Sequence, residues 1–140
     1  MPIERLIKRP VQSLPPEASC ADAARLMRDA NVGSVVVTRD GRPLGIVTDR
    51  DLAVRVIADG VDAGRLPIGE IMSGEPIFLS SERDIAQVVA IMRDLGVRRI
   101  PIVDAEGMLS GVVSLDDLVL LLADQLTSLA QCIRHEVEGS

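Results

Sequence analysis

Apolar side chains recur every three or four positions in several parts of the chain, which is the spacing that places them on one face of a helix. Ala23, Met27 and Ala30 show this period after Ser19, and Asp22 lies three residues beyond that serine. A hydroxyl followed by a carboxylate at this distance is the capping box that begins a helix. Patterns of this kind predict four helices, over residues 20–30, 48–59 and 84–95 and from about residue 115 onward.

Short runs of β-branched and aliphatic residues lie between these helices and are bounded by turn signals, which is the pattern of strands. Val35–Val37 and Leu44–Val47 flank the segment Arg39–Arg42, which contains Asp-Gly, so they predict a hairpin. A second pair of runs with the same arrangement predicts a second hairpin, and a shorter candidate strand precedes each helix and hairpin. The predicted strands cover residues 11–14, 35–37, 44–47, 77–79, 100–103 and 109–113.

The two halves of the chain are copies of one unit. Leu26–Asp29 recurs as Ile91–Asp94, 65 residues later, and after one inserted residue Gly45–Asp51 matches Gly111–Asp117 at an offset of 66. The match spans about 55 residues per copy, and a unit of that size buries too little surface to be stable alone. We therefore expect an α/β (α+β) fold in which two β-α-β-β-α repeats pack through their sheets about a pseudo-twofold axis.

The repeat divides the chain into a first copy at residues 1–60, a linker at 61–67, a second copy at 68–126 and a C-terminal helix extension at 127–140. The last helix outgrows its counterpart, which stops at Gly60. Two interpretations of its apolar stripe stay open: it lies on the protein's own surface, or it forms a subunit contact. We expect the second, and with it a homodimer. The stripe consists of Leu118, Leu122, Leu126, Leu129, Ile133 and Val137.

Composition narrows the classes of partner. Phe78 is the only aromatic residue and the formal net charge is −6, so the chain lacks the stacking platforms and the positive charge that nucleic-acid binding needs. The longest aliphatic run near the end, Leu118–Ala123, is far shorter than the ~20 residues of a membrane span. Cys20 and Cys132 lie far apart, as small buried or half-buried residues, and with a single histidine in the chain neither a disulfide nor a metal site is indicated. We expect a cytoplasmic protein that binds neither nucleic acid nor membranes.

One motif with candidate chemistry occurs in both copies: glycine, two aliphatic residues, a hydroxyl, two variable positions and an aspartate. It places Thr48 before Asp51 and Ser114 before Asp117. One interpretation is structural, because this spacing is that of a capping box. The other is a binding corner, in which a hydroxyl and exposed N–H groups bind phosphate and the carboxylate accepts both hydroxyls of a ribose. The sequence contains no P-loop, nucleophile elbow or zinc-protease motif, so we expect no enzyme.

The duplicated unit, its two corners and the segments Val32–Val37 and Gly96–Asp104 resemble a tandem pair of cystathionine-β-synthase-type (CBS) domains, a Bateman module. The resemblance covers nearly the whole chain. In that family the paired domains bind adenosine compounds in clefts between the copies, and the modules commonly pair into dimers. The resemblance therefore implies a ligand sensor rather than a catalyst.

Carried over residue by residue, the resemblance implies roles for both corners. Thr48 and Ser114 are expected to contact ribose or phosphate. Asp51 and Asp117 are expected to hold the ribose hydroxyls. These assignments require two sites, one at each corner.

Four further residues complete the implied sites. Val11 and Ile77, on the short entering strands, are expected to flank the base. Arg98 and Arg99 match basic positions that contact phosphates in some relatives, the alternative being a solvated strand edge. The equivalent places in the first copy, Gly33–Ser34, carry no charge. The two sites are therefore expected to be unequal.

The function that we expect from these residues is that of a non-catalytic regulatory module that binds AMP, ADP, ATP or S-adenosylmethionine and requires no cofactor. Its output is expected to pass through an unidentified protein partner, a change of assembly or buffering of the ligand concentration. The alternative is a constitutive homodimerisation scaffold, in which the two corners are only helix caps.

Overall fold

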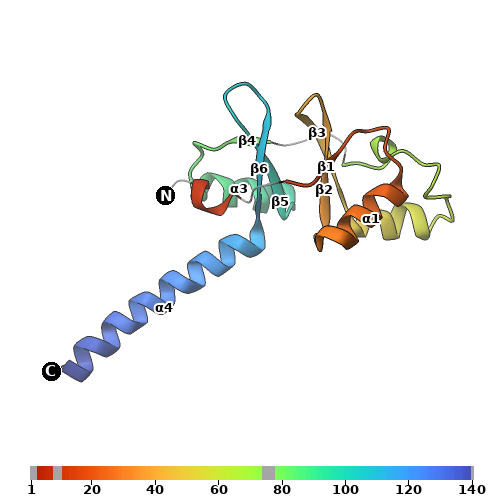
Figure 1. Cartoon of the computed structure of the whole chain (residues 1–140). Coiled ribbons are helices and arrows are strands. Elements are labelled where there is room, and N and C mark those ends of the chain that lie inside the picture. The colour runs from red at the N-terminus through yellow and green to blue at the C-terminus, as the bar shows by residue number, and fades with distance from the viewer. Residues whose placement is uncertain (1–2, 8–10, 74–77, 140) are drawn as a thin grey trace.

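The computed structural model of the chain, shown in Figure 1, describes residues 3–7, 11–73 and 78–139. The first repeat contains β1 (Ser13–Leu14), α1 (Cys20–Ala30), β2 (Ser34–Arg39), β3 (Arg42–Thr48), α2 (Asp49–Leu52) and the short helix η2 (Ala53–Ile57). The second contains β4 (Leu79–Ser80), α3 (Ile85–Leu95), β5 (Arg99–Val103), β6 (Leu109–Ser114) and α4 (Leu115–Gly139). A single 3-10 turn leads into each repeat, η1 (Ile3–Leu6) and η3 (Ile68–Glu70). The predicted mixed α/β fold of two repeats is confirmed.

Each repeat builds one three-stranded sheet, and the two sheets have the same topology. Their strand orders are β1-β2-β3 and β4-β5-β6, with the short first strand parallel to its neighbour and the hairpin antiparallel. The register is repeated as well, because Val35 pairs with Val47 in the first hairpin and the equivalent Ile100 pairs with Val113 in the second. The duplication seen in the sequence therefore extends to individual residue pairs.

The turn of the first hairpin is the predicted Asp-Gly turn. Asp40 and Gly41 have φ angles of 53° and 79°, the left-handed backbone that a type I′ hairpin needs. This turn also touches the second repeat: the Leu109 N–H donates to the Gly41 carbonyl over 2.8 Å, and Arg42 donates to the Glu106 carbonyl over 2.7 Å. The tips of the two hairpins, which lie side by side in Figure 1, are therefore tied together.

The first helix of each repeat begins where the sequence predicts. Ser19 precedes α1, and its hydroxyl accepts a hydrogen bond from the Asp22 N–H over 3.0 Å. Asp84 precedes α3, and its carboxylate accepts from the Ala86 N–H over 3.2 Å. These bonds satisfy N–H groups that have no partner inside the helix, which is why a short polar side chain begins each one.

The helix predicted over residues 48–59 is not a regular α-helix. The α-helical part, α2, is a single turn, and the chain then continues as the π-helix η2, in which the Ala58 N–H donates to the Ala53 carbonyl over 3.0 Å. Val56 is the buried residue of η2. A hydrophobic period of three to four residues predicts a helical path but does not distinguish the i+4 bond from the wider i+5 bond, which explains the error.

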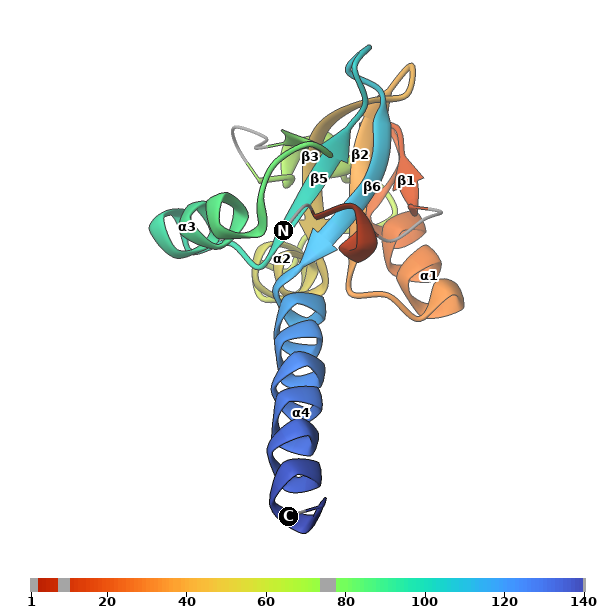
Figure 2. The same ribbon diagram turned by 90° about the vertical axis from the view of Figure 1, so that its left-hand side faces the viewer.

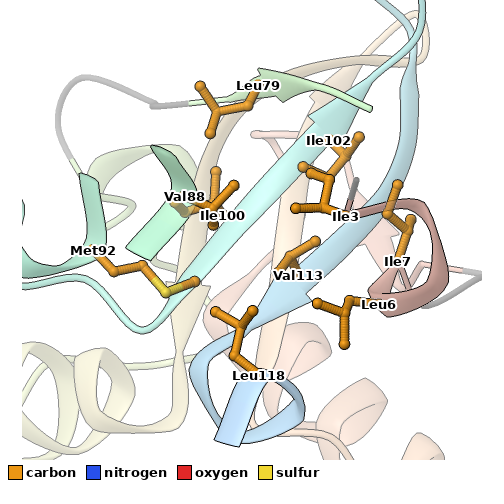
Figure 3. Close-up of a cluster of buried hydrophobic side chains, with 10 residues drawn as sticks. All are labelled: Ile3, Leu6, Ile7, Leu79, Val88, Met92, Ile100, Ile102, Val113 and Leu118. Atoms are coloured by element: carbon orange, nitrogen blue, oxygen red, sulfur yellow. The ribbon is translucent and has the colours of Figure 1, made fainter. Parts of the chain in front are cut away.

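The hydrophobic cores show that the two repeats exchange their leading segments. Figure 3 shows Ile3, Leu6 and Ile7 packed against Ile100 and Val113, so the segment at the start of the chain fills the core of the second repeat. The start of the second repeat does the reverse. Its residues Ile68 and Ile71 pack in the core of the first repeat, with Cys20, Ala23, Met27, Val35, Val37, Val47 and Val56. Each core is therefore completed by residues that the sequence assigns to the other copy.

Helix α4 begins on the second repeat and then leaves it. Leu118 is buried in that core, with Leu115 and Leu121 packed partly against it. Further along, Figures 1 and 2 show the helix running away from both sheets. It carries Cys132 on an exposed position, which contradicts the expectation of a half-buried thiol, whereas Cys20 is buried in the first core as expected. Burial raises the pKa of the Cys20 thiol, so it stays protonated. Among the described residues, no helix is long and apolar enough to cross a membrane.

Candidate functional site

The two corner motifs lie at the ends of equivalent strands, where β3 turns into α2 and β6 turns into α4. In the first corner the Asp51 N–H donates to the Thr48 hydroxyl over 3.1 Å, and the Thr48 N–H donates to the Asp51 carboxylate over 2.9 Å. In the second corner the Asp117 N–H donates to the Ser114 hydroxyl over 3.2 Å. The hydroxyl therefore caps the following helix in both repeats, as the structural interpretation of the motif requires.

A cleft of about 400 Å³ opens onto the second corner, and both repeats line it. From the first repeat, Val11 and Gln12 line the cleft just before β1, and Ser34 lines it at the start of β2. The second contributes Arg99 at the start of β5, together with the corner residues Ser114 and Asp117. The cleft thus exists only because the two repeats are packed together.

The cleft gathers four of the residues predicted to bind a ligand: Val11, Arg99, Ser114 and Asp117. The other four lie elsewhere or are not described. Thr48 and Asp51 form the first corner and are not among the residues that line this cleft. Arg98 is exposed, and its guanidinium pairs with the Asp116 carboxylate over 2.9 Å, which fits the solvated strand edge that the sequence left as the alternative. Ile77 lies outside the described residues.

Arg99 is placed differently from Arg98, although the two are adjacent in the sequence. Its side chain is half-buried and crosses towards the first repeat, where a Cβ atom on Gly33 would lie 3.3 Å from its Nη2 atom. The same Cβ would lie 3.2 Å from the Oδ2 atom of Asp49. Among the described residues, none forms a hydrogen bond or an ion pair with the Arg99 guanidinium. This cation is therefore available to a ligand in the cleft.

The sequence assigned Gly33–Ser34 and Arg99 to two different sites, and the structure places them on one cleft. Gly33 faces the Arg99 guanidinium, and because Gly33 has no side chain there is space for this guanidinium. Gln12 and Asn31 also line this wall, and they were missed because neither belongs to a repeated motif. The sequence did contain a signal for the role of Gly33. It is equivalent to Arg98 in the second repeat, and a glycine at this position leaves space for a neighbouring side chain.

The chemistry of the cleft is that of a binding site. In the part of the lining that the structure describes, Val11, Val36 and Val112 supply an apolar wall, and the polar groups are hydroxyls, amides, carboxylates and one guanidinium. Apolar surface with a few convergent polar groups is the usual composition of a small-molecule pocket. The described lining contains no histidine or cysteine, so it holds no pair of a nucleophile and an imidazole base of the kind that catalyses acyl transfer.

Comparison with protein families matches the CBS domain twice, to residues 3–57 and 68–124. The chain is 36% identical over 110 residues to the CBS domain-containing protein YhcV of Bacillus subtilis, which covers 79% of this chain and 77% of that protein. It is 32% identical over 118 residues to an uncharacterized protein of Methanopyrus kandleri. That match covers 84% of this chain but 60% of the other protein, so the chain spans less than two thirds of that relative.

Comparison with solved structures gives the same fold. A CBS domain protein from Pyrobaculum aerophilum, solved in complex with AMP, superposes with a TM-score of 0.78 at 29% sequence identity. The superposition covers 89% of this chain and 99% of that chain. Both repeats and their packing are therefore similar to those of a protein that binds an adenine nucleotide.

Proposed function

Because the chain belongs to the CBS domain family, with two copies of the domain packed against each other, we propose that it is a non-catalytic regulatory module that binds an adenosine nucleotide in the cleft between the copies. The observation that carries this proposal is the convergence of Val11, Arg99, Ser114 and Asp117 on one cleft. Each of these side chains supplies a different part of what an adenosine nucleotide needs.

The ribose and the base account for three of the four residues. The Asp117 carboxylate accepts hydrogen bonds, and a carboxylate at the start of a helix can accept from the two vicinal hydroxyls of a ribose. Val11 and Val112 line the same cleft from opposite repeats and supply apolar surface for the two faces of a purine. The Ser114 hydroxyl lies beside Asp117 at the first turn of α4, where exposed N–H groups favour an anion.

The charges of the cleft favour a ligand with one phosphate. Among the described residues that line the cleft, Arg99 is the cation, and Arg98 is already paired with Asp116. Asp116 and Asp117 also line the cleft, and the Asp49 carboxylate lies beside Gly33 at its edge. A guanidinium matches one phosphate as a bidentate partner, whereas each further phosphate adds negative charge near these carboxylates. We therefore favour AMP over ADP and ATP, and the AMP complex of the Pyrobaculum protein supports this choice.

We assign a second, weaker site to the first corner. Thr48 and Asp51 repeat the hydroxyl and carboxylate of the second corner, and Ile77 would flank the base there. The equivalent of Arg99 in the first repeat is Ser34, which carries no charge and itself lines the cleft at the second corner, so the first corner has no guanidinium from its own hairpin for a phosphate. The first corner is therefore expected to bind the nucleoside part of a ligand with less dependence on phosphate.

Isothermal titration calorimetry on the full chain tests the proposal, with AMP, ADP, ATP, adenosine and S-adenosylmethionine as separate ligands. AMP is expected to bind most tightly. At 100 times its dissociation constant it should stabilise the folded state by about 2.7 kcal/mol, which thermal unfolding would show as a rise in Tm. If none of the five ligands gives heat or raises Tm at millimolar concentration, the sensor is rejected and a ligand-free scaffold remains.

A further inference from the structure

Helix α4 presents an apolar stripe that the described part of the chain leaves uncovered. Its exposed fractions are 55% for Val119, 48% for Leu122, 67% for Leu126, 62% for Leu129, 63% for Ile133 and 70% for Val137. Figures 1 and 2 show that this part of the helix extends beyond both sheets. At 3.6 residues per turn, these six side chains fall within an arc of about 80°. Together they form a patch of several hundred Å², the size at which an exposed patch indicates a contact.

The spacing of the stripe is that of a two-stranded coiled coil. From Val119 to Ile133 the apolar residues alternate steps of three and four, which makes Val119, Leu126 and Ile133 a positions and Leu122 and Leu129 d positions of a heptad. Two of the three a positions are β-branched and both d positions are leucine, the combination that favours a parallel pair of helices. Glu136 occupies the next d position, so the pattern ends one turn before the end of the helix.

The flanks of the stripe indicate which partner covers it. The e and g positions carry Ala123, Gln125, Ala130 and Cys132, none of which is a charged side chain. Two identical helices can therefore approach without repulsion between like charges. A different chain is usually selected by complementary charges at e and g, and α4 offers none in these heptads.

The opposite face of α4 makes a lipid surface a poor partner. Interfacial helices carry lysine and arginine on their polar face, which attracts anionic headgroups. Beyond Ala123 this helix has Asp124, Glu136 and Glu138 against the single cation Arg134. The net negative charge of this segment disfavours an anionic membrane.

We propose that residues 119–133 of α4 pair with the same segment of a second copy as a parallel two-stranded coil. The twofold axis then runs along the helices, and the two CBS-domain pairs lie at the same end of the assembly. This proposal rests on α4 alone and is independent of the nucleotide site, which lies between the sheets.

Sedimentation equilibrium on the full chain tests the pairing. At tens of micromolar the mass should be about 30 kDa, twice the 15.0 kDa of one chain. Leu129→Glu places a charge at a central d position and should raise the dimer dissociation constant at least about 30-fold, as the loss of an interface hot spot does. Gln131→Glu adds the same charge on the opposite face and should leave the dimer intact. A monomeric full chain, or a Leu129→Glu variant that dimerises as tightly as the parent, overturns the proposal.

Disulfide trapping tests the parallel orientation. In a Cys132→Ser background, which keeps the buried Cys20, one cysteine is introduced either at Leu122 near the start of the stripe or at Ile133 near its end. In a parallel coil in register each variant should form disulfide dimers with itself, because equal positions face each other. An antiparallel pair would place position 122 opposite position 133, so that only the mixture of the two variants cross-links, and that result rejects the parallel arrangement. Ser128→Cys, on the opposite face, is the control that should not cross-link.

Discussion

The corner of the first repeat and the corner of the second both turn from a strand into a helix that a hydroxyl caps, and they differ in charge. Four residues after the aspartate, the first repeat has Arg55, whose Nε atom lies 4.0 Å from the Asp51 carboxylate. The equivalent position in the second repeat is Leu121, which packs against the hydrophobic core. The second variable position also differs, because Arg50 stands where the second corner has Asp116. Asp51 thus has a cation four residues further along the chain, whereas at the same distance from Asp117 the second repeat has an apolar side chain.

This difference distinguishes helix capping, which the motif performs in both corners, from ligand binding, which needs further residues. The hydroxyl caps the following helix in both corners, so capping follows from the motif alone. A binding cleft needs more, namely a wall from the other repeat and a cation that no carboxylate neutralises. Among the described residues, the second corner has both, through Val11 and Arg99. The two repeats therefore share the same capped turn from strand to helix, and residues outside the motif determine which corner can bind a ligand.

The largest effect is expected where the repeats exchange their leading segments. Ile3 and Ile68 are both fully buried, each in the core of the opposite repeat. Ile3→Ala and Ile68→Ala should each lower the free energy of unfolding by about 2–5 kcal/mol, the usual cost of truncating a buried isoleucine. Denaturant titration measures the loss. Ile57→Ala, at a residue that is 76% exposed, is the control and should change stability by less than about 0.5 kcal/mol.

Hydrogen exchange localises the same effect. Ile3→Ala should speed amide exchange in α3, β5 and β6, because Ile3 fills the core of the second repeat. Faster exchange confined to α1 and β2 would contradict the exchange of segments.

The sequence predicted the features that depend on neighbours along the chain. Both hairpins, the start of α1 at Ser19 and the helix caps in both corners follow from short motifs, because their hydrogen bonds join residues only a few positions apart. At the repeat offset of 65 residues Ile3 aligns with Ile68, and both lie in 3-10 turns. Nothing in that local pattern says which core each turn enters. The exchange depends on contacts between distant segments, and so does the position of Arg99 opposite Gly33.

The second effect compares the two aspartates. Asp117→Ala should weaken AMP binding by about 1–3 kcal/mol, since it removes hydrogen bonds from a charged acceptor to the ribose. Asp51→Ala removes a capping bond and should reduce stability more than affinity for the tighter site. Calorimetry and thermal unfolding of both variants give the two quantities.

Asp117 also lies at the first turn of α4, so its variants need a check on folding. Asp117→Asn keeps the size of the side chain and should reproduce the loss of affinity with a smaller loss of stability. Asp124→Ala removes an exposed carboxylate from the polar face of α4 and is the control for charge. If Asp117 and Asp51 variants lose affinity equally, the distinction between the corners fails.

The third effect concerns the two adjacent arginines. Arg99→Ala should weaken AMP binding by about 1–2 kcal/mol and adenosine binding hardly at all, because only AMP presents a phosphate to the guanidinium and the half-buried site is partly screened by solvent. Arg98→Ala breaks an exposed pair with Asp116 and should change the affinity for either ligand by less than about 1 kcal/mol. Equal losses for AMP and adenosine in Arg99→Ala would show that this residue does not bind phosphate.

The smallest effect is expected at the N-caps of α1 and α3, where equivalent positions of the two repeats carry different functional groups. Ser19 begins α1 with a hydroxyl, and Asp84 begins α3 with a carboxylate. Ser19→Ala leaves the Asp22 N–H without its acceptor and should lower the free energy of unfolding by about 1 kcal/mol. Ser19→Asp gives the first repeat the residue of the second, and a carboxylate both caps and favours the positive end of the helix, so stability should change by less than about 0.5 kcal/mol. Denaturant titration of the two variants measures the difference in the free energy of unfolding. If Ser19→Asp is as unstable as Ser19→Ala, the two caps are not interchangeable, and the repeats differ already at the start of α1.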